Sequence, residues 1–302
     1  MTRNTHTWAL LPLVTLMMAS PSLFAAAIGT PTQAERLPEE TTLRQIGELD
    51  WHTDYVAAYK EANRNKQELL ICFEHQSPEQ QTRFEQNVLS SAAFKEELGG
   101  FVRAILPLNA AVPGENQTLL WHPSFQYMYK QAGIAILDLT DETSPLHGQL
   151  VTAHPFRSGH TCSADELQTL LTLPSGTITQ RTLIYALKRH PEQPQSVNST
   201  VHPYLLHMSN VNSNTMARLN QVGHHNWSSR FQQINGAVGG LSSEVAVSGN
   251  GYTLLDIAND CIRTWRSSAG HWNSMRQRHR YYGYDMVQGS NGTWYATGVF
   301  AD

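Results

Sequence analysis

The chain has 302 residues, of which 40% are hydrophobic and 15% charged, and its formal net charge is −4. This composition supports a buried core and excludes wholesale disorder, and the length predicts two domains or one large one. The excess of acidic residues argues against a protein that coats nucleic acid over its whole surface. Three cysteines are too few for a disulfide scaffold and allow at most one internal pair.

The first 27 residues are typical of a secretory signal peptide. Arg3 provides a positive start, an apolar stretch runs from Trp8 to Met18, and small residues follow. The apolar stretch is short for a membrane-spanning helix, so no transmembrane segment is expected once the signal is removed. We therefore expect an exported protein that is periplasmic, envelope-associated or extracellular. A retained N-terminal anchor is the alternative.

Residues 28–47 are rich in Pro, Thr and Glu and are interpreted as a linker, after which helices and strands alternate. Residues 69–73 form a continuous apolar run, typical of a strand buried on both faces, in which Cys72 serves as a small hydrophobic residue. Ser163 with Glu166 three residues later predicts a capped helix start. The expected elements are a helix at 54–63, a strand at 69–73, a helix at 78–98, strands at 101–108, 133–139 and 149–152, and a helix at 164–173.

A set of residues around the first apolar strand has a distinctive spacing: Trp51, Ala58, Ala62, Lys66, residues 69–73, Val88, Leu89, Phe101 and Val102. This pattern resembles the thioredoxin-like family over residues 48–173 and implies an α/β domain. Members of that family carry a C-x-x-C at the start of the next helix, but residues 75–81 contain no cysteine, and Ala132-Gly133 stands where the family has a cis-proline. Because thiol–disulfide exchange needs a thiolate, a degenerate scaffold or binding module is expected instead of a redox enzyme.

The break at residues 174–176 is followed by mixed helices and strands, which predicts an α+β sandwich. The elements expected there are helices at 177–189, 203–219 and 256–266, and strands at 245–247 and 293–300. A turn at 290–293 feeds the last strand.

Three segments of this half have a recognisable order and spacing. They are residues 216–224, which begin Met216-Ala217 and end at His224; Ser243-Glu244-Val245-Ala246; and residues 265–275, which contain Gly270-His271-Trp272. Together with the closing strand, they resemble the bacterial branch of the CAP superfamily, the cysteine-rich secretory, antigen 5 and pathogenesis-related type-1 proteins, over residues 178–302. The resemblance implies a CAP-like α-β-α sandwich.

The resemblance also implies a cleft in which His224, Glu244 and His271 meet, with Arg230 and Trp272 as ligand contacts. Two imidazoles and a carboxylate can hold a divalent metal such as zinc and leave one position open. Glu244 is then the candidate base for hydrolysis. The second glutamate of many family members has no counterpart here. A histidine hydrogen-bonded to a carboxylate without a metal is the structural alternative.

The leading interpretation is an exported, non-catalytic binding protein whose cleft takes a small molecule, lipid, glycan or protein partner. A metal-dependent hydrolase at the same cleft is the alternative, and a redox protein is disfavoured. His225, next to His224, leaves the register of the first histidine open by one residue.

Five arginines lie within residues 263–280, interleaved with aromatic residues and with no acid among them. Such a cluster can bind nucleic acid, another polyanion or an acidic glycan. A solvated basic face is favoured, and no nucleic-acid partner is expected for an exported acidic protein.

Overall fold

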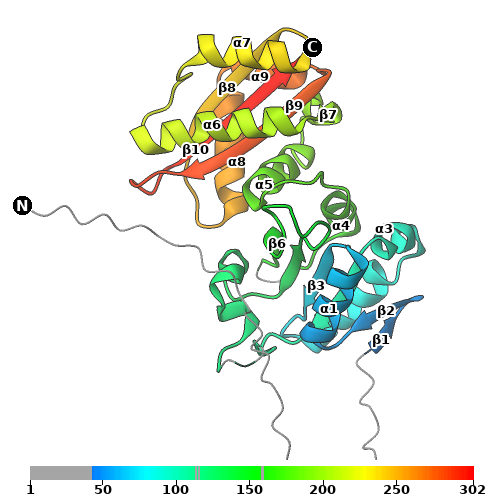
Figure 1. The fold of residues 1–302 in the computed structure, drawn as a ribbon. Coiled ribbons are helices and arrows are strands. Elements are labelled where there is room, and N and C mark those ends of the chain that lie inside the picture. The colour runs from blue at the N-terminus through cyan, green and yellow to red at the C-terminus, as the bar shows by residue number, and fades with distance from the viewer. Residues whose placement is uncertain (1–42, 113, 115, 158–159) are drawn as a thin grey trace, which may run out of the picture. The chain divides into compact units, whose positions relative to one another are not determined.

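The computed structural model describes residues 43–302, apart from 113, 115, 158 and 159. The expected signal peptide at 1–27 and the first part of the expected linker therefore lie outside the described residues. Two mixed β-sheets, each accompanied by helices, make up the described part of the chain (Figure 1), so the fold is mixed α/β as predicted.

The first sheet has six strands in the order β1-β2-β4-β3-β5-β6. Strand β4 runs parallel to β2 and β3, whereas β5 is antiparallel to both β3 and β6. Its strands and the helices around it are β1 (Leu43–Ile46), β2 (Leu49–His52), α1 (Tyr55–Asn65), β3 (Leu69–Phe73), α2 (Pro78–Phe84), α3 (Lys95–Gly99), β4 (Val102–Leu106), β5 (Gly133–Leu137), β6 (Leu150–Pro155) and α4 (Ala164–Leu171).

Strand β3 is buried on both faces, as its continuous apolar sequence predicts. Leu69, Ile71 and Phe73 point to the face covered by α1, where Ala58 and Ala62 meet them. The alternate residues, including Cys72, join the apolar cluster on the other face, which holds residues of α2 and α4. The two-residue period of a strand thus places a separate core on each side of the sheet.

The expected linker at 28–47 extends too far, because its last residues form strand β1. This strand pairs with β2 in an antiparallel hairpin, and Ile46 is buried there. Gly47 turns the hairpin at φ 61°, and a Cβ at this position would lie 2.8 Å from the Cα of Ser90. Only glycine fits both the left-handed backbone and the close contact.

The single helix expected at 78–98 is also corrected, because the structure breaks it into short pieces. After α2 comes a π-helical turn at Glu85–Leu89, then a 3-10 turn at Ala92–Phe94 that leads into α3. Ser91 stops the helix because its backbone is extended and its hydroxyl accepts a hydrogen bond from the amide of Ala93.

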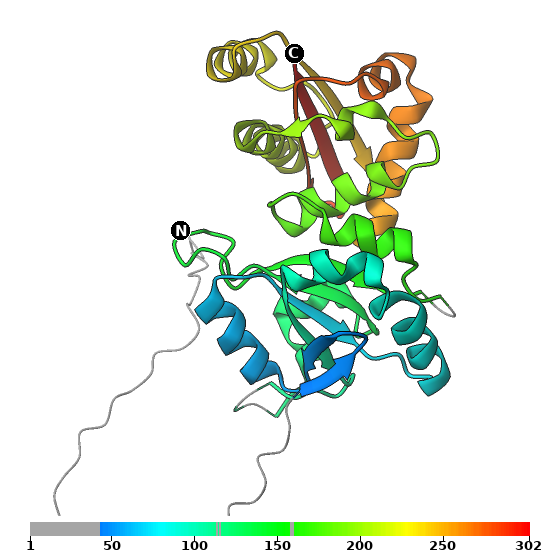
Figure 2. The same cartoon turned by 90° about the vertical axis from the view of Figure 1, so that its right-hand side faces the viewer.

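The second sheet has four strands in the order β7-β9-β10-β8, with helices on both faces. Helices α6 and α7 cover one face, and α5, α8 and α9 lie on the other, as Figure 2 shows edge-on. The elements are α5 (Ile178–Lys188), β7 (Thr200–Val201), α6 (Pro203–Leu219), α7 (Trp227–Val238), β8 (Ser242–Gly249), α8 (Leu254–Ser267), α9 (Ala269–Arg276), β9 (Tyr281–Gln288) and β10 (Trp294–Ala301).

Helix α6 lies unusually close to β9, and polar side chains form much of the contact. A Cβ at Gly283 would lie 2.3 Å from the backbone of Leu205, so the two backbones touch there. Ser209 donates to the carbonyl of Gly283, and Ser213 donates to the carbonyl of Asp285, at 2.8 and 3.1 Å. These serines are fully buried, and their hydrogen bonds offset the cost of removing hydroxyls from water.

Helix α5 connects the two sheets. It packs against β6 of the first sheet and against α8 and β9, and the apolar cluster continues through it. The buried guanidinium of Arg181 pairs with Glu68, which precedes β3, at 2.5 Å. The amide of Leu254 donates to the hydroxyl of Tyr129 at 3.1 Å, another contact between the two halves of the sequence.

All three cysteines are buried and unpaired. Burial raises the pKa of each thiol, that of Cys261 to about 12. Neutral buried thiols are poor nucleophiles, which agrees with the interpretation of Cys72 as a small core residue. None of the helices in the described part of the chain is long and apolar enough to cross a membrane.

The stability of the junction between β6 and α5 is expected to depend on pH through His154. Its ring lies 5.3 Å from that of Tyr185, and burial lowers the pKa of His154 to about 4. Since an unfolded histidine titrates near 6.5, protonation favours the unfolded chain. Stability is therefore full above about pH 6.5 and falls by about 3 kcal/mol as the pH approaches 4.

Urea unfolding at pH 7 and pH 4.5 tests this expectation, with His154→Gln beside the wild type. The variant should lose less stability between the two pH values, because it lacks the titrating ring. Equal losses in the two proteins would contradict a role for His154.

Candidate functional site

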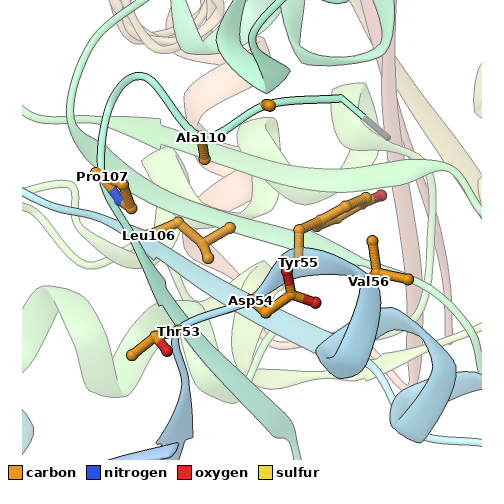
Figure 3. Close-up of a pocket in the computed structure, with 8 residues that line it drawn as sticks. Thr53, Asp54, Tyr55, Val56, Leu106, Pro107 and Ala110 are labelled. Atoms are coloured by element: carbon orange, nitrogen blue, oxygen red, sulfur yellow. The ribbon is translucent and has the colours of Figure 1, made fainter. Parts of the chain in front are cut away.

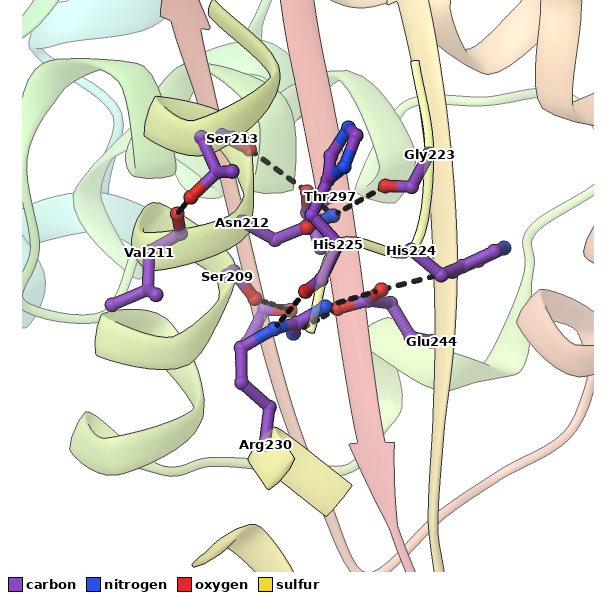
Figure 4. A network of polar contacts seen from close by, with 12 residues as sticks. Ser209, Val211, Asn212, Ser213, Gly223, His224, His225, Arg230, Glu244 and Thr297 are labelled. Carbon is purple, nitrogen blue, oxygen red and sulfur yellow. Dashed lines mark hydrogen bonds and ion pairs between the residues drawn. The ribbon is translucent and has the colours of Figure 1, made fainter. Parts of the chain in front are cut away.

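The site is built from three segments of the second sheet and its helices. His224 lies in the loop between α6 and α7, Arg230 lies in the first turn of α7, and Glu244 lies near the start of β8. The imidazole Nδ1 of His224 is 2.9 Å from one carboxylate oxygen of Glu244 (Figure 4). The structure thus brings together His224 and Glu244, two of the residues predicted for the cleft.

Arg230 occupies both oxygens of the same carboxylate. One terminal guanidinium nitrogen donates to Oε1 of Glu244 at 2.8 Å, and the other donates to Oε2. The side chains of Arg230 and Glu244 are only 5% and 1% exposed. A two-point pair of this kind is strong and directional, and it cancels the buried negative charge.

This arrangement corrects the expected role of Arg230. Its guanidinium faces inward to Glu244, and its Nε donates to the carbonyl of His225 at 3.0 Å, so it is not presented to a ligand. Arg230 is a structural partner of the carboxylate and of the loop that carries His224.

The loop between α6 and α7 is held at several points. Asn220 and Asn226 at its two ends have left-handed backbones, φ 52° and 53°, which asparagine tolerates better than most residues. Asn212 of α6 donates to the carbonyl of Gly223 at 3.1 Å. The ring of His225 lies 3.1 Å from the carbonyl of Gln221, within its own loop. His224, not His225, is therefore the histidine that contacts Glu244.

His271, at the start of α9, is the second histidine of the predicted cleft. The ring centres of His224 and His271 lie 6.4 Å apart. Burial and the neighbouring His224 lower the pKa of His271. The side chain of His224 is 46% exposed, so the pair is open to solvent on that side.

Trp272 does not join this group, which corrects its expected role as a ligand contact. It is 3% exposed, and its indole donates to Glu192 at 2.9 Å. Its ring also packs edge-on against His190, with the centres 5.1 Å apart. The indole is therefore a core side chain that anchors α9.

The donor set fits a tightly held zinc ion poorly. Among the residues that the structure describes, no three His, Cys, Asp or Glu side chains are grouped as a metal site requires. Arg230 already donates to both oxygens of Glu244 and neutralises its charge, which makes this carboxylate a weaker ligand for a cation. A structural or catalytic zinc site usually has three or four protein ligands, whereas this arrangement offers two imidazoles.

Asn212 and Thr297 contribute to the site without having been predicted for it. Asn212 donates to the hydroxyl of Thr297 at 3.2 Å as well as to the loop, and both side chains are fully buried (Figure 4). The sequence does contain a feature that could have indicated this contribution. Ser209, Asn212 and Ser213 are polar and recur at helical spacing on a helix face that is otherwise expected to be apolar.

A separate cavity of about 270 Å³ lies in the first half of the chain, between the start of α1 and the end of β4 (Figure 3). Its ionisable groups are Asp54 and Tyr55. Asp54 accepts a hydrogen bond from the amide of Ala57 and caps α1. Burial raises the pKa of Tyr55 to about 12. Asp54 thus has a structural role in capping α1, and burial keeps the hydroxyl of Tyr55 protonated near neutral pH.

Comparison with models of known protein families gives no match to this chain, and comparison with curated protein sequences gives none either. The assignment of function therefore rests on the quoted motifs and on the geometry of the histidine pair.

Arg230→Met is expected to lower the free energy of unfolding by about 3–5 kcal/mol, because it leaves Glu244 buried without a counter-charge. Adding Glu244→Gln should recover part of this loss. Urea unfolding of the two single variants and the double variant measures the coupling. Arg218→Met, at an exposed position on α6, is the matched control and should change stability by less than about 0.5 kcal/mol. Purely additive losses would show that the ion pair is not the cause.

Proposed function

We propose that this is an exported, non-catalytic binding protein that uses the surface around His224 and His271. In this proposal, residues 178–302 form a CAP-like domain and residues 48–173 a thioredoxin-like scaffold without C-x-x-C. The ligand class is a small molecule, lipid, glycan or protein partner. The expected signal peptide places the protein in the periplasm, on the envelope or outside the cell.

Two features of the fold support the family assignments. The four-stranded sheet lies between two helical layers, as a CAP-like α-β-α sandwich requires. In the first sheet, two parallel strands are followed by the antiparallel pair β5 and β6 and a final helix, α4, which is the order expected for a thioredoxin-like domain.

The observation that carries the binding proposal is the pairing of Glu244 with Arg230. A general base or a metal ligand acts through the negative charge of its carboxylate. Arg230 donates to both oxygens of Glu244 and neutralises that charge. What remains for a ligand is a pair of imidazoles above a neutralised carboxylate, which supports binding over hydrolysis.

Glu244 has a clear role in this arrangement. It orients His224 by contacting Nδ1, which leaves Nε2 directed away from the carboxylate and free to contact a ligand. Imidazole nitrogens can accept or donate hydrogen bonds, so the pair suits a polar ligand group or a weakly bound cation.

A metal-dependent hydrolase remains the alternative, and zinc is the probe that separates the two functions. Titrated zinc should perturb the ring resonances of His224 and His271 in NMR spectra, reversibly and with weak affinity. The His224→Ala/His271→Ala variant should give no such response. Hydrolysis of casein and of p-nitrophenyl esters with zinc present should not exceed the rate of this variant.

Two results would overturn the proposal. Zinc retained through purification, together with hydrolysis that is lost in Glu244→Gln, would establish the hydrolase. Histidine rings that do not respond to zinc at all would show that the pair is closed to ligands. Thermal melting of each variant checks that it is folded.

A further inference from the structure

The basic segment that joins α9 to β9 presents three unpaired arginines to solvent. Arg276 ends α9, and Arg278 and Arg280 follow it in the connection; all three are exposed. Among the described residues, no carboxylate pairs with any of them, although the guanidinium of Arg280 lies 4.8 Å from the ring centre of Tyr281. We call Arg276, Arg278 and Arg280 the arginine row.

The other two arginines of the cluster are already neutralised. Arg263 pairs with Asp260, and Arg266 pairs with Glu192. Within residues 263–280, the unpaired positive charge is thus confined to the arginine row, in a chain whose net charge is −4. A local concentration of charge that differs in sign from the whole molecule attracts an oppositely charged partner.

The backbone of the row is held in place by the residue between its last two arginines. His279 is buried and stacks on Phe300 with ring centres 4.6 Å apart. Its two ring nitrogens lie 2.9 Å from Asp302 and from the carbonyl of Ser274, and its amide donates to Ser199. The segment is therefore fixed without any contribution from the arginine side chains.

The chain between α9 and β9 is irregular, and β9 begins only at Tyr281. Gln277 has an extended backbone, and the carbonyl of Arg280 accepts a hydrogen bond from the amide of Thr200 at 3.2 Å. His279 is buried, whereas Arg278 and Arg280 on either side of it are exposed. The carboxylate of Asp302 contacts the buried ring of His279.

We propose that the arginine row binds a linear acidic polysaccharide. Guanidinium groups form two-point hydrogen bonds with carboxylate and sulfate groups. Three exposed guanidiniums within five residues match a polymer with repeated acidic groups better than they match one small anion. Each exposed contact is weak, so affinity comes from several contacts along one chain.

The aromatic residues of the cluster distinguish this partner from nucleic acid. Single-stranded nucleic acids bind through bases stacked on exposed aromatic rings. Trp265, Trp272, Tyr282 and Tyr284 are all buried in this structure. Tyr281 is partly covered, with His202 at one edge and Arg280 over its ring. The row therefore offers charge without a stacking platform for bases, which favours an acidic glycan over single-stranded nucleic acid.

The test uses polygalacturonate and dextran sulfate as probes, with uncharged dextran as the control polymer and oligo(dT) as the nucleic-acid probe. Binding is measured by calorimetry at low and at physiological salt. We expect both acidic polysaccharides to bind, more weakly as salt rises, and dextran not to bind.

The decisive variant is Arg276→Gln/Arg278→Gln/Arg280→Gln. We expect it to bind the acidic polysaccharides roughly tenfold or more weakly than the wild type. Its matched control is Arg64→Gln/Arg83→Gln/Arg218→Gln, which removes the same charge from exposed positions on three separate helices. The control should retain affinity within about twofold of the wild type.

Three results would overturn the proposal: no binding of either polysaccharide at low salt, equal losses in the two variants, or tighter binding of oligo(dT) than of both polysaccharides. Thermal melting of both variants checks folding, which should be intact because the replaced side chains make no ion pairs among the described residues. The result is independent of the histidine pair, so failure here leaves the proposed function untouched.

Discussion

A carboxylate and a guanidinium that are both removed from water must stay together, because either one alone would be a buried charge without compensation. Arg230 and Glu244 are in this position, and the surrounding geometry follows from it. The ion pair links the first turn of α7 to the start of β8, and Arg230 also donates a hydrogen bond to the carbonyl of His225. The loop that carries His224 is therefore fixed by the same guanidinium that neutralises the carboxylate beneath it.

Helix α6 also fixes this loop, through hydrogen bonds from its buried polar side chains. Asn212 reaches from the helix to Gly223 and to Thr297 of β10, and Ser213 donates to the same threonine. A helix that packs on a sheet through leucines can slide or rotate with little loss, whereas hydrogen bonds specify one position. The polar face of α6 thus gives the histidine loop a defined place on the sheet.

Much of the secondary structure could be predicted where burial is strongly periodic or continuous. The strand at 69–73, the helix at 203–219 and the capped start at Ser163 are all confirmed. The helix α7 was missed because its sequence is mostly polar, and only Arg230 and Ile234 are buried in it. Strand β1 was missed because it is an edge strand that buries only Ile46.

The candidate site, like the secondary structure, could be predicted only in part. Motif order predicted His224, Glu244 and His271 as site residues, and the structure brings the first two into contact and places the third nearby. The spacing of motifs in the sequence does not determine the direction in which a side chain points. Arg230 and Trp272 were expected to face a ligand, yet a buried carboxylate and Glu192 respectively turn them inward. Both partners lie far away in sequence, so only the folded chain reveals them.

The close contact between α6 and β9 has a genetic consequence. Any side chain at Gly283 would collide with the backbone of Leu205 and push the helix away from the sheet. Asn212 would then lose its hold on Gly223, although neither histidine had been altered. Under the proposed function, a collection of loss-of-function alleles would therefore contain substitutions at Gly283 alongside those of the histidines. The alleles alone would not distinguish a residue proposed to contact the ligand from one that sets the distance between a helix and the sheet.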